Sequence, residues 1–143
     1  MGLVYRGEYA NPNMVELELE QMDARVMALE SATAAASPTT IAVTHSRTLS
    51  ASETGSSVTN EGAASAIVVT LPSAVTDLTF RFYVQVAQTL EVVAGDGDTI
   101  RIGADVTAAG GSITSNTVGH SVVLVAVNNA EWIGFGSAGT WTF

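Results

Sequence analysis

The sequence predicts a mainly β protein with an N-terminal α-helical coiled coil followed by an antiparallel β-sandwich or jelly-roll-like domain. Two observations carry this prediction. Apolar residues near the start of the chain recur with the 4, 3, 4, 3 spacing of a coiled-coil heptad. From about Ile41 onward the apolar period becomes two, and turn residues interrupt the chain at short intervals. We expect three segments, a leader over 1–13, a coiled-coil helix over 14–36 and a β domain over 37–143.

The signals at both ends of the helical segment support a helix. Asn13 is a good N-cap residue, and Glu16 three positions later completes a variant of the capping box. Acidic residues cluster in the first turns, where the positive end of the helix dipole favours them. The helix is expected to end before Pro38, because the residue preceding a proline resists the helical conformation.

The same segment predicts a homotrimer. Residues 25–30 read Arg, apolar, any, any, apolar, Glu, which resembles a known coiled-coil trimerisation signature. Arg25 falls at heptad position g and Glu30 at e, where an ion pair between chains is geometrically allowed. A lone amphipathic helix packed on the β domain is the alternative, since fewer than three heptads is short for a coiled coil. We therefore expect the β domains to associate as well. The predicted trimerisation residues are Val15, Leu19, Met22, Arg25, Val26, Leu29 and Glu30.

The β domain contains one clear half-buried strand and two apolar runs. Apolar and polar residues alternate over 78–86, as on a strand with one face in a core. The unbroken runs 67–71 and 122–127 predict central strands that are buried on both faces. Weaker strands are expected near 41–44, 47–50, 56–59, 89–93, 99–102, 131–135 and 140–143.

Composition limits the function classes. The chain has 143 residues, a net charge of −9 and no lysine, so it is expected to repel nucleic-acid backbones and anionic membranes. It has no cysteine, which excludes disulfides and thiolate metal sites. No window is apolar enough for a membrane-spanning helix, and the first residues lack the pattern of a secretion signal.

No catalytic residue, metal site or cofactor is predicted. His45 and His120 lie among small polar residues without ligand spacing and are expected to be exposed or hydrogen-bonded loop histidines. The turn over 95–98 carries two aspartates, like the calcium turns of repeated β-helices, but it occurs once and predicts a hairpin between 89–93 and 99–102. No Gly-x-Ser-x-Gly motif for a nucleophilic serine is present.

Four aromatic residues crowd the C-terminus, and two interpretations compete. In the first, Trp132, Phe135 and Trp141 fill the core or a seam between subunits. In the second, an exposed Trp141 or Phe143 offers a stacking platform for sugars or for a partner protein.

The β region resembles a domain found in structural proteins of tailed bacteriophages. The resemblance covers roughly 47–143 and rests on a pattern of strands and turns, namely 48–50, Gly55, 58–60, 66–72, 78–82 and 139–141. It implies a non-enzymatic virion protein, a trimeric decoration (cement) protein or short head fibre that is bound to the outer surface of the capsid and stabilises it. The implied partners are further copies of this chain and the major capsid protein of a phage. The resemblance carries no active-site residues.

The short leader is the expected capsid anchor. Leu3, Val4, Tyr5 and Tyr9 are apolar or aromatic residues outside any predicted core. Deleting residues 2–12 is expected to abolish capsid binding and to leave the trimer intact, and retained binding would contradict this role.

The alternative function is a short tail fibre or receptor-binding tip, in which the C-terminal aromatics or the loops near Gly110 and Gly111 contact host glycans. A bacterial trimeric adhesin module is a third candidate.

Overall fold

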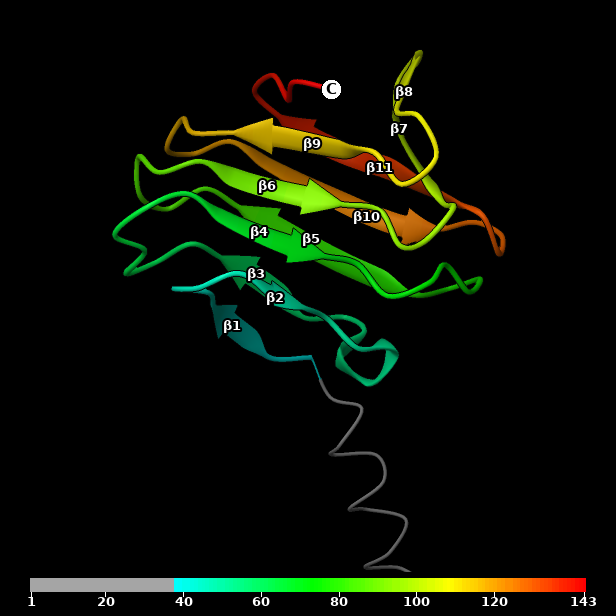
Figure 1. Cartoon of the computed structure of the whole chain (residues 1–143), viewed down its shortest axis with the longest axis horizontal. Helices are drawn as coiled ribbons and strands as arrows, with labels where there is room; N and C mark the ends of the chain where they lie inside the picture. Colours follow the sequence, from blue (N-terminus) through cyan, green and yellow to red (C-terminus); the bar gives the residue numbers. More distant parts are fainter. Residues whose placement is uncertain (1–37) are drawn as a thin grey trace, which may run out of the picture. The chain divides into compact units, whose positions relative to one another are not determined.

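The computed structural model describes residues 38–143, which form two stacked β-sheets (Figure 1). The seven-stranded sheet has the order β1-β3-β5-β10-β11-β7-β8, and the four-stranded sheet has the order β2-β4-β6-β9. A short 3₁₀ helix, η1 (Ala51–Glu53), follows β2. The strands are β1 (Thr40–Ala42), β2 (Arg47–Thr48), β3 (Ser57–Thr59), β4 (Ile67–Thr70), β5 (Thr79–Tyr83), β6 (Leu90–Val93), β7 (Thr99–Ile102), β8 (Asp105–Val106), β9 (Ser112–Ser115), β10 (Ser121–Ala126) and β11 (Glu131–Ala138).

The first six strands wind back and forth between the two sheets. Strands β1, β3 and β5 lie in the large sheet and pair in parallel, while β2, β4 and β6 do the same in the small sheet. Strands β9, β10 and β11 then close the sandwich with antiparallel pairs, β6–β9, β5–β10 and β10–β11. Both sheets are therefore mixed.

The prediction of a mainly β domain is confirmed, whereas the antiparallel, jelly-roll-like arrangement is wrong. The period of two shows which side chains face the core, but it does not reveal which strand lies alongside or in which direction it runs. Turn residues at short intervals suggested an antiparallel sandwich, although most of the connections cross from one sheet to the other. A two-layer winding of this kind makes parallel neighbours out of strands two apart in the sequence.

Most of the expected strands are present. The alternation over 78–86 is confirmed in β5, whose Phe80 and Phe82 are buried while Arg81 and Tyr83 are exposed. The two apolar runs are buried on one face only, because β4 and β10 show alternating buried and half-buried residues. No strand forms over 140–143, where Thr142 makes only an isolated bridge to Thr114. Strands β8 and β9 were not predicted. The strand β8 has only two residues, and β9 contains just one apolar residue.

The core lies between the sheets and is built from alternate residues of both. Its largest side chain, Trp132 of β11, is fully buried and lies with its ring centroid 5.9 Å from that of Phe80. The smaller side chains that fill the space around this pair include Leu90, Ile113 and Leu124, all 0 % exposed. This apolar layer is the main source of stability, because burial of such side chains is the dominant favourable term in folding.

One polar residue is fully buried beside this core and makes four hydrogen bonds. The Asn60 side-chain amide donates to the carbonyl oxygens of Val86 (3.0 Å) and Gln88 (2.9 Å). Its side-chain oxygen accepts from the backbone N–H groups of Gln85 (2.7 Å) and Val86 (3.1 Å). Asn60 thus pairs with residues 85–88 as a neighbouring strand would, and it holds the β3–β4 connection against the β5–β6 connection.

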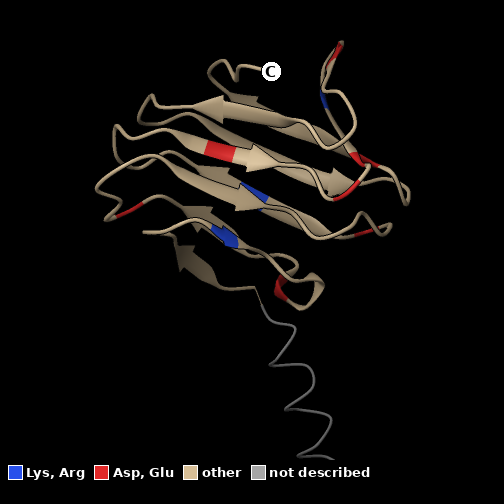
Figure 2. Ribbon diagram, in the orientation of Figure 1, with Lys and Arg blue, Asp and Glu red and all other residues tan. Residues whose placement is uncertain are grey.

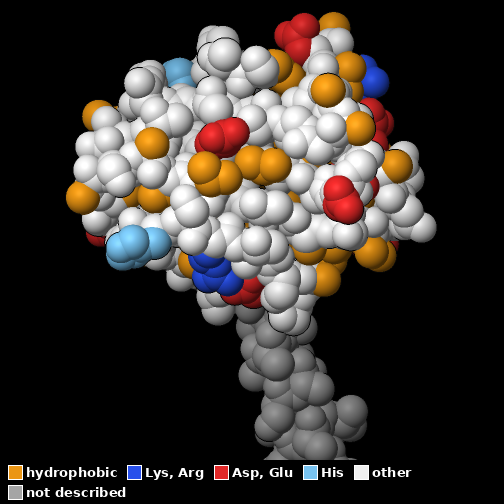
Figure 3. Space-filling view, in the orientation of Figure 1, with side chains coloured by type: hydrophobic (Ala, Val, Ile, Leu, Met, Phe, Trp, Pro, Cys, Tyr) orange, Lys and Arg blue, Asp and Glu red, His pale blue; other side chains and the backbone are white. Residues whose placement is uncertain are grey.

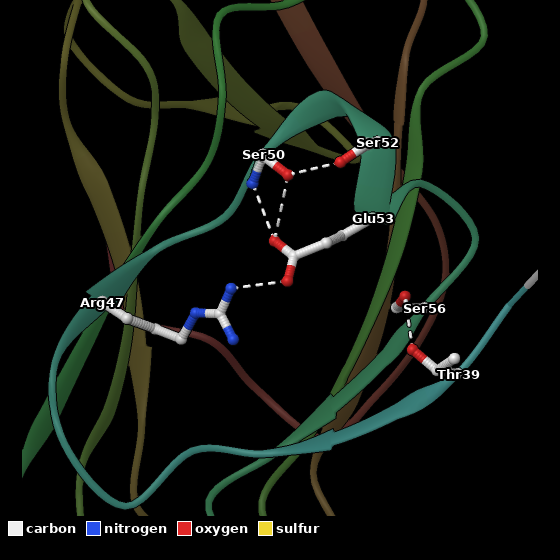
Figure 4. Close-up of polar contacts among 6 residues, drawn as sticks. All are labelled: Thr39, Arg47, Ser50, Ser52, Glu53 and Ser56. Carbon is white, nitrogen blue, oxygen red and sulfur yellow. Dashed lines mark hydrogen bonds and ion pairs between the residues drawn. The ribbon is translucent and has the colours of Figure 1, made fainter. Parts of the chain in front are cut away.

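A charged residue stabilises the turn after β2 (Figure 4). The Glu53 carboxylate accepts a hydrogen bond from the backbone N–H of Ser50 (2.8 Å) and forms an ion pair with Arg47. Burial alone acts to raise the pKa of Glu53, but the Ser50 hydrogen bond and the Arg47 guanidinium outweigh it and lower the pKa below 4.5. The ionised carboxylate is therefore preferred in the folded state.

This arrangement predicts a small pH dependence of stability. A carboxyl group with a lowered folded pKa stabilises the protein above its unfolded pKa, and this contribution is lost as the pH falls through the folded pKa. Glu53→Gln is expected to lower the free energy of unfolding by less than about 1 kcal/mol at pH 7, because the pair is partly exposed. Urea unfolding of both proteins between pH 7 and pH 3 should show this difference vanishing in acid. A difference that is independent of pH would contradict the assignment.

Candidate functional site

The site residues predicted from the sequence lie outside the described residues. The seven trimerisation residues over 15–30 and the four anchoring residues over 3–9 all precede residue 38. Their roles and the proposed segment boundaries at 13, 36 and 37 stay predictions. The candidate sites below are therefore those of residues 38–143.

Both histidines are hydrogen-bonded loop residues, as predicted. The Nδ1 atom of His45 lies 3.0 Å from the hydroxyl of Thr44, and Nδ1 of His120 lies 2.8 Å from the hydroxyl of Ser115. Within residues 38–143, no group of three histidine or carboxylate side chains is arranged to hold a metal ion. In the same part of the chain, no helix is long and apolar enough to cross a membrane.

The aspartate-containing turn over 95–98 is not a hairpin, since it connects β6 of the small sheet to β7 of the large sheet. Asp98 is 4 % exposed and its carboxylate accepts a hydrogen bond from the backbone N–H of Ala74 (2.7 Å). Its carbonyl oxygen accepts from the N–H of Gly110 (2.7 Å). Gly95 is required here, because a Cβ atom would lie 2.9 Å from the Asp98 carboxylate and from the Pro72 carbonyl oxygen. Asp98 thus holds three connections together.

This structural role of Asp98 predicts a measurable loss on truncation. Asp98→Ala leaves the Ala74 N–H buried without its acceptor, so the free energy of unfolding should fall by about 1–3 kcal/mol. Asp96→Ala is the matched control, because Asp96 is exposed in the same turn and should change stability by less than about 0.5 kcal/mol. Thermal and urea unfolding of the two variants would measure this, and equal stabilities would refute the role.

The aromatic residues divide between core and surface. Trp132 belongs to the core, as the first interpretation expected. Trp141 is only 5 % exposed and donates from Nε1 to the carbonyl oxygen of Ser121 (3.1 Å), so it is not an exposed platform. Phe135 and Phe143 are exposed at 54 % and 45 %, and Phe135 is therefore outside the core of this domain.

The outer face of the large sheet carries an apolar stripe across β5, β10 and β11. Val123 and Val125 of β10 alternate with buried residues and point away from the core, and the register places Ile133 beside Val125. Tyr83 ends β5 on the same face and is 43 % exposed, and Phe135 follows in β11. We call Tyr83, Val123, Val125, Ile133 and Phe135 the outer stripe.

Basic residues flank the outer stripe. Arg81 pairs in register with Val123, and Arg101 pairs in register with Ile133. Arg101 also forms an ion pair with Glu131 at 3.1 Å. Two of the three basic residues of the described part thus adjoin this face. Of the acidic residues over 38–143, Glu91, Asp105 and Glu131 lie in strands and the other five lie between strands (Figure 2).

A pocket of about 400 Å³ lies where β9 ends and where β6 and β10 begin. Its lining consists of uncharged polar side chains and one histidine from four separate parts of the chain. The small-sheet side of the molecule is likewise mostly uncharged, with few charged groups among polar and apolar ones (Figure 3). The lining residues are Thr89, Thr114, Ser115, Asn116, Thr117, His120, Thr140 and Thr142.

The pocket was not predicted, although half of its lining is contiguous. Residues 114–117 read Thr-Ser-Asn-Thr, which is a polar stretch typical of an ordinary β loop. Only the fold brings Thr89 and the C-terminal residues Thr140 and Thr142 to this stretch. No motif or spacing in the sequence predicts that these distant residues lie together.

No protein-family model matches this sequence, and a search of curated proteins finds no similar one.

Proposed function

We propose that this chain is a non-enzymatic structural protein of a phage particle, a trimeric decoration (cement) protein or short head fibre on the outside of the capsid. The heptad over 15–29 and the resemblance of 47–143 to β domains of tailed-phage structural proteins support the proposal. Its trimer binds the assembled shell and not the separate capsid proteins, so binding stabilises the shell by mass action.

The observation that carries this proposal is the outer stripe. Five apolar or aromatic residues lie together on a sheet face that no other described strand covers. A contiguous apolar patch on a sheet face is typical of an interaction site. The occupant we propose is a second copy of this chain. The adjoining Arg81 reduces the mutual repulsion that a net charge of −9 per chain creates on association, whereas the charge of Arg101 is already balanced by Glu131.

Self-association through the outer stripe gives a direct test on the full chain. The wild-type protein should have a solution mass near 3 × 14.7 = 44.1 kDa. Val125→Glu places a charge in the stripe and should raise the concentration at which the trimer dissociates by at least about tenfold. Val68→Glu is the matched control, because Val68 is a half-buried, outward-facing residue of the small sheet. Light scattering over a dilution series would measure both variants, and equal dissociation would refute the interface.

Location on the particle tests the function itself. Gold-labelled antibody against this chain should decorate the heads of particles from the source culture. Labelling confined to the tail end would overturn the decoration role in favour of a receptor-binding tip. Particles that carry no label would overturn both functions.

A further inference from the structure

We propose that the pocket lined by Thr89, Thr114, Ser115, Asn116, Thr117, His120, Thr140 and Thr142 binds a neutral saccharide unit. This inference does not rest on the proposed function, because it concerns a different surface from the outer stripe and holds for a head or a tail protein.

The charge of the lining selects the ligand class. None of the eight lining residues is an Asp, Glu, Lys or Arg. An anionic ligand would have no lysine or arginine to pair with there and would meet a chain of net charge −9. A cationic ligand would have no carboxylate to pair with. A neutral molecule rich in hydroxyl groups is the ligand that matches this lining.

Most of the residues that line the pocket have free hydrogen-bonding side chains. Among residues 38–143, the side chains of Thr89, Thr114, Asn116, Thr117, Thr140 and Thr142 make no hydrogen bond to another residue. Each threonine hydroxyl can donate and accept, and the Asn116 amide can do both as well. Saccharide hydroxyls need this combination of donors and acceptors, and the threonine methyl groups can contact the sugar C–H groups.

The centre of the pocket is held in place. The Ser115 hydroxyl, 9 % exposed as a residue, pairs with His120 Nδ1 (2.8 Å) and accepts from the Thr117 backbone N–H (3.3 Å). The His120 ring also packs on Gly139, where a Cβ atom would lie 2.0 Å from the ring. Fixed polar groups favour binding, since less side-chain entropy is lost when the ligand arrives.

The size of the pocket limits the ligand to a short saccharide. A volume of about 400 Å³ lies near the lower end of the roughly 300–1,000 Å³ found for small-molecule sites. It is open on one side, as the exposure of Asn116, Thr117 and Thr140 shows. We expect weak binding of a single unit, with a dissociation constant on the order of 1 mM.

Nuclear magnetic resonance of the full ¹⁵N-labelled chain tests the proposal. The probes are D-glucose, D-galactose and N-acetyl-D-glucosamine, each titrated to about 50 mM so that a millimolar site approaches saturation. At least one of them should produce saturable shifts of the amide signals of residues 114–120 and 140–142, while the Trp132 indole signal stays in place. Absence of saturable shifts with all three sugars, or tighter binding of inorganic phosphate, would overturn the proposal.

Matched variants locate the site. Thr117→Val with Thr140→Val removes two hydroxyls without changing side-chain shape, and it should weaken binding by at least about tenfold. Thr48→Val with Thr76→Val makes the same change at two exposed threonines outside the pocket and should leave binding unchanged. Asn116→Ala, in the exposed loop, serves as the second test if the first pair perturbs the fold. Equal affinity in the pocket variants and the control would overturn the assignment.

Discussion

Replacing Trp132 with alanine should lower the free energy of unfolding by about 3–5 kcal/mol. Trp132 is fully buried between the sheets, is the largest buried side chain and contacts Phe80. Truncation would leave a cavity that the surrounding strands cannot fill, because β11 is held by β10 on one side and by β7 on the other. Urea unfolding at neutral pH, followed by circular dichroism, would measure the loss.

Trp132→Phe separates the contribution of ring packing to stability from the cost of the unpaired indole N–H group. The Trp132 Nε1–H group has no partner among the described residues. A buried donor without a partner costs about 1–3 kcal/mol, and Trp132→Phe removes that donor while it keeps an aromatic ring. We expect Trp132→Phe to cost less than half as much as Trp132→Ala. Phe143→Ala, at a residue that is 45 % exposed, is the control and should cost less than about 1 kcal/mol. A loss below 1 kcal/mol for Trp132→Ala would show that the sandwich does not depend on this residue.

Asn60→Ala should lower the free energy of unfolding by about 3–4 kcal/mol, because it removes all four hydrogen bonds of a fully buried side chain. The N–H groups of Gln85 and Val86 and the carbonyl oxygen of Gln88 would then lose these partners, while the Val86 carbonyl oxygen keeps the hydrogen bond from the Gln88 N–H (2.7 Å). Residues 85–88 lie between β5 and β6 and have no strand beside them to replace these bonds. Amide hydrogen exchange at Gln85 and Val86 should accelerate in the variant by a factor that matches the loss of stability.

Asn60→Asp gives a sharper test, because it changes only the two donors. An ionised carboxylate would place an oxygen near 3 Å from the Val86 and Gln88 carbonyl oxygens, where the amide nitrogen now donates. Burial and this repulsion should raise the folded pKa of the new carboxyl group above its unfolded value. The variant should then be closest to wild type in stability at acid pH and lose stability as the pH rises above about 4. Asn129→Asp, in an exposed turn, is the control and should show no such pH dependence. A constant penalty across the pH range would contradict the geometry of Asn60.

In residues 38–143, the alternation of apolar and polar residues predicted the positions of strands but not their pairing. Alternation of apolar and polar residues placed β5 and most other strands correctly, because it depends only on which side chains face the core. It did not reveal the parallel pairs β1–β3–β5 and β2–β4–β6, because strand direction depends on contacts between distant segments. The strand β9 was not predicted, because Ile113 is its sole apolar residue and one residue makes no alternating pattern.

The sequence by itself determined the mainly β character of the domain and the positions of most strands, because these follow from the local apolar pattern. The structure then placed Trp132 in the core, which the sequence had left open between the core and a seam between subunits. The tertiary structure decided the mixed topology, the four-fold bonding of Asn60, the outer stripe and the hydroxyl-lined pocket. Each of these depends on residues far apart in the chain, such as Thr89 and Thr142 in the pocket. Their proximity arises from long-range strand pairing, which no local period encodes.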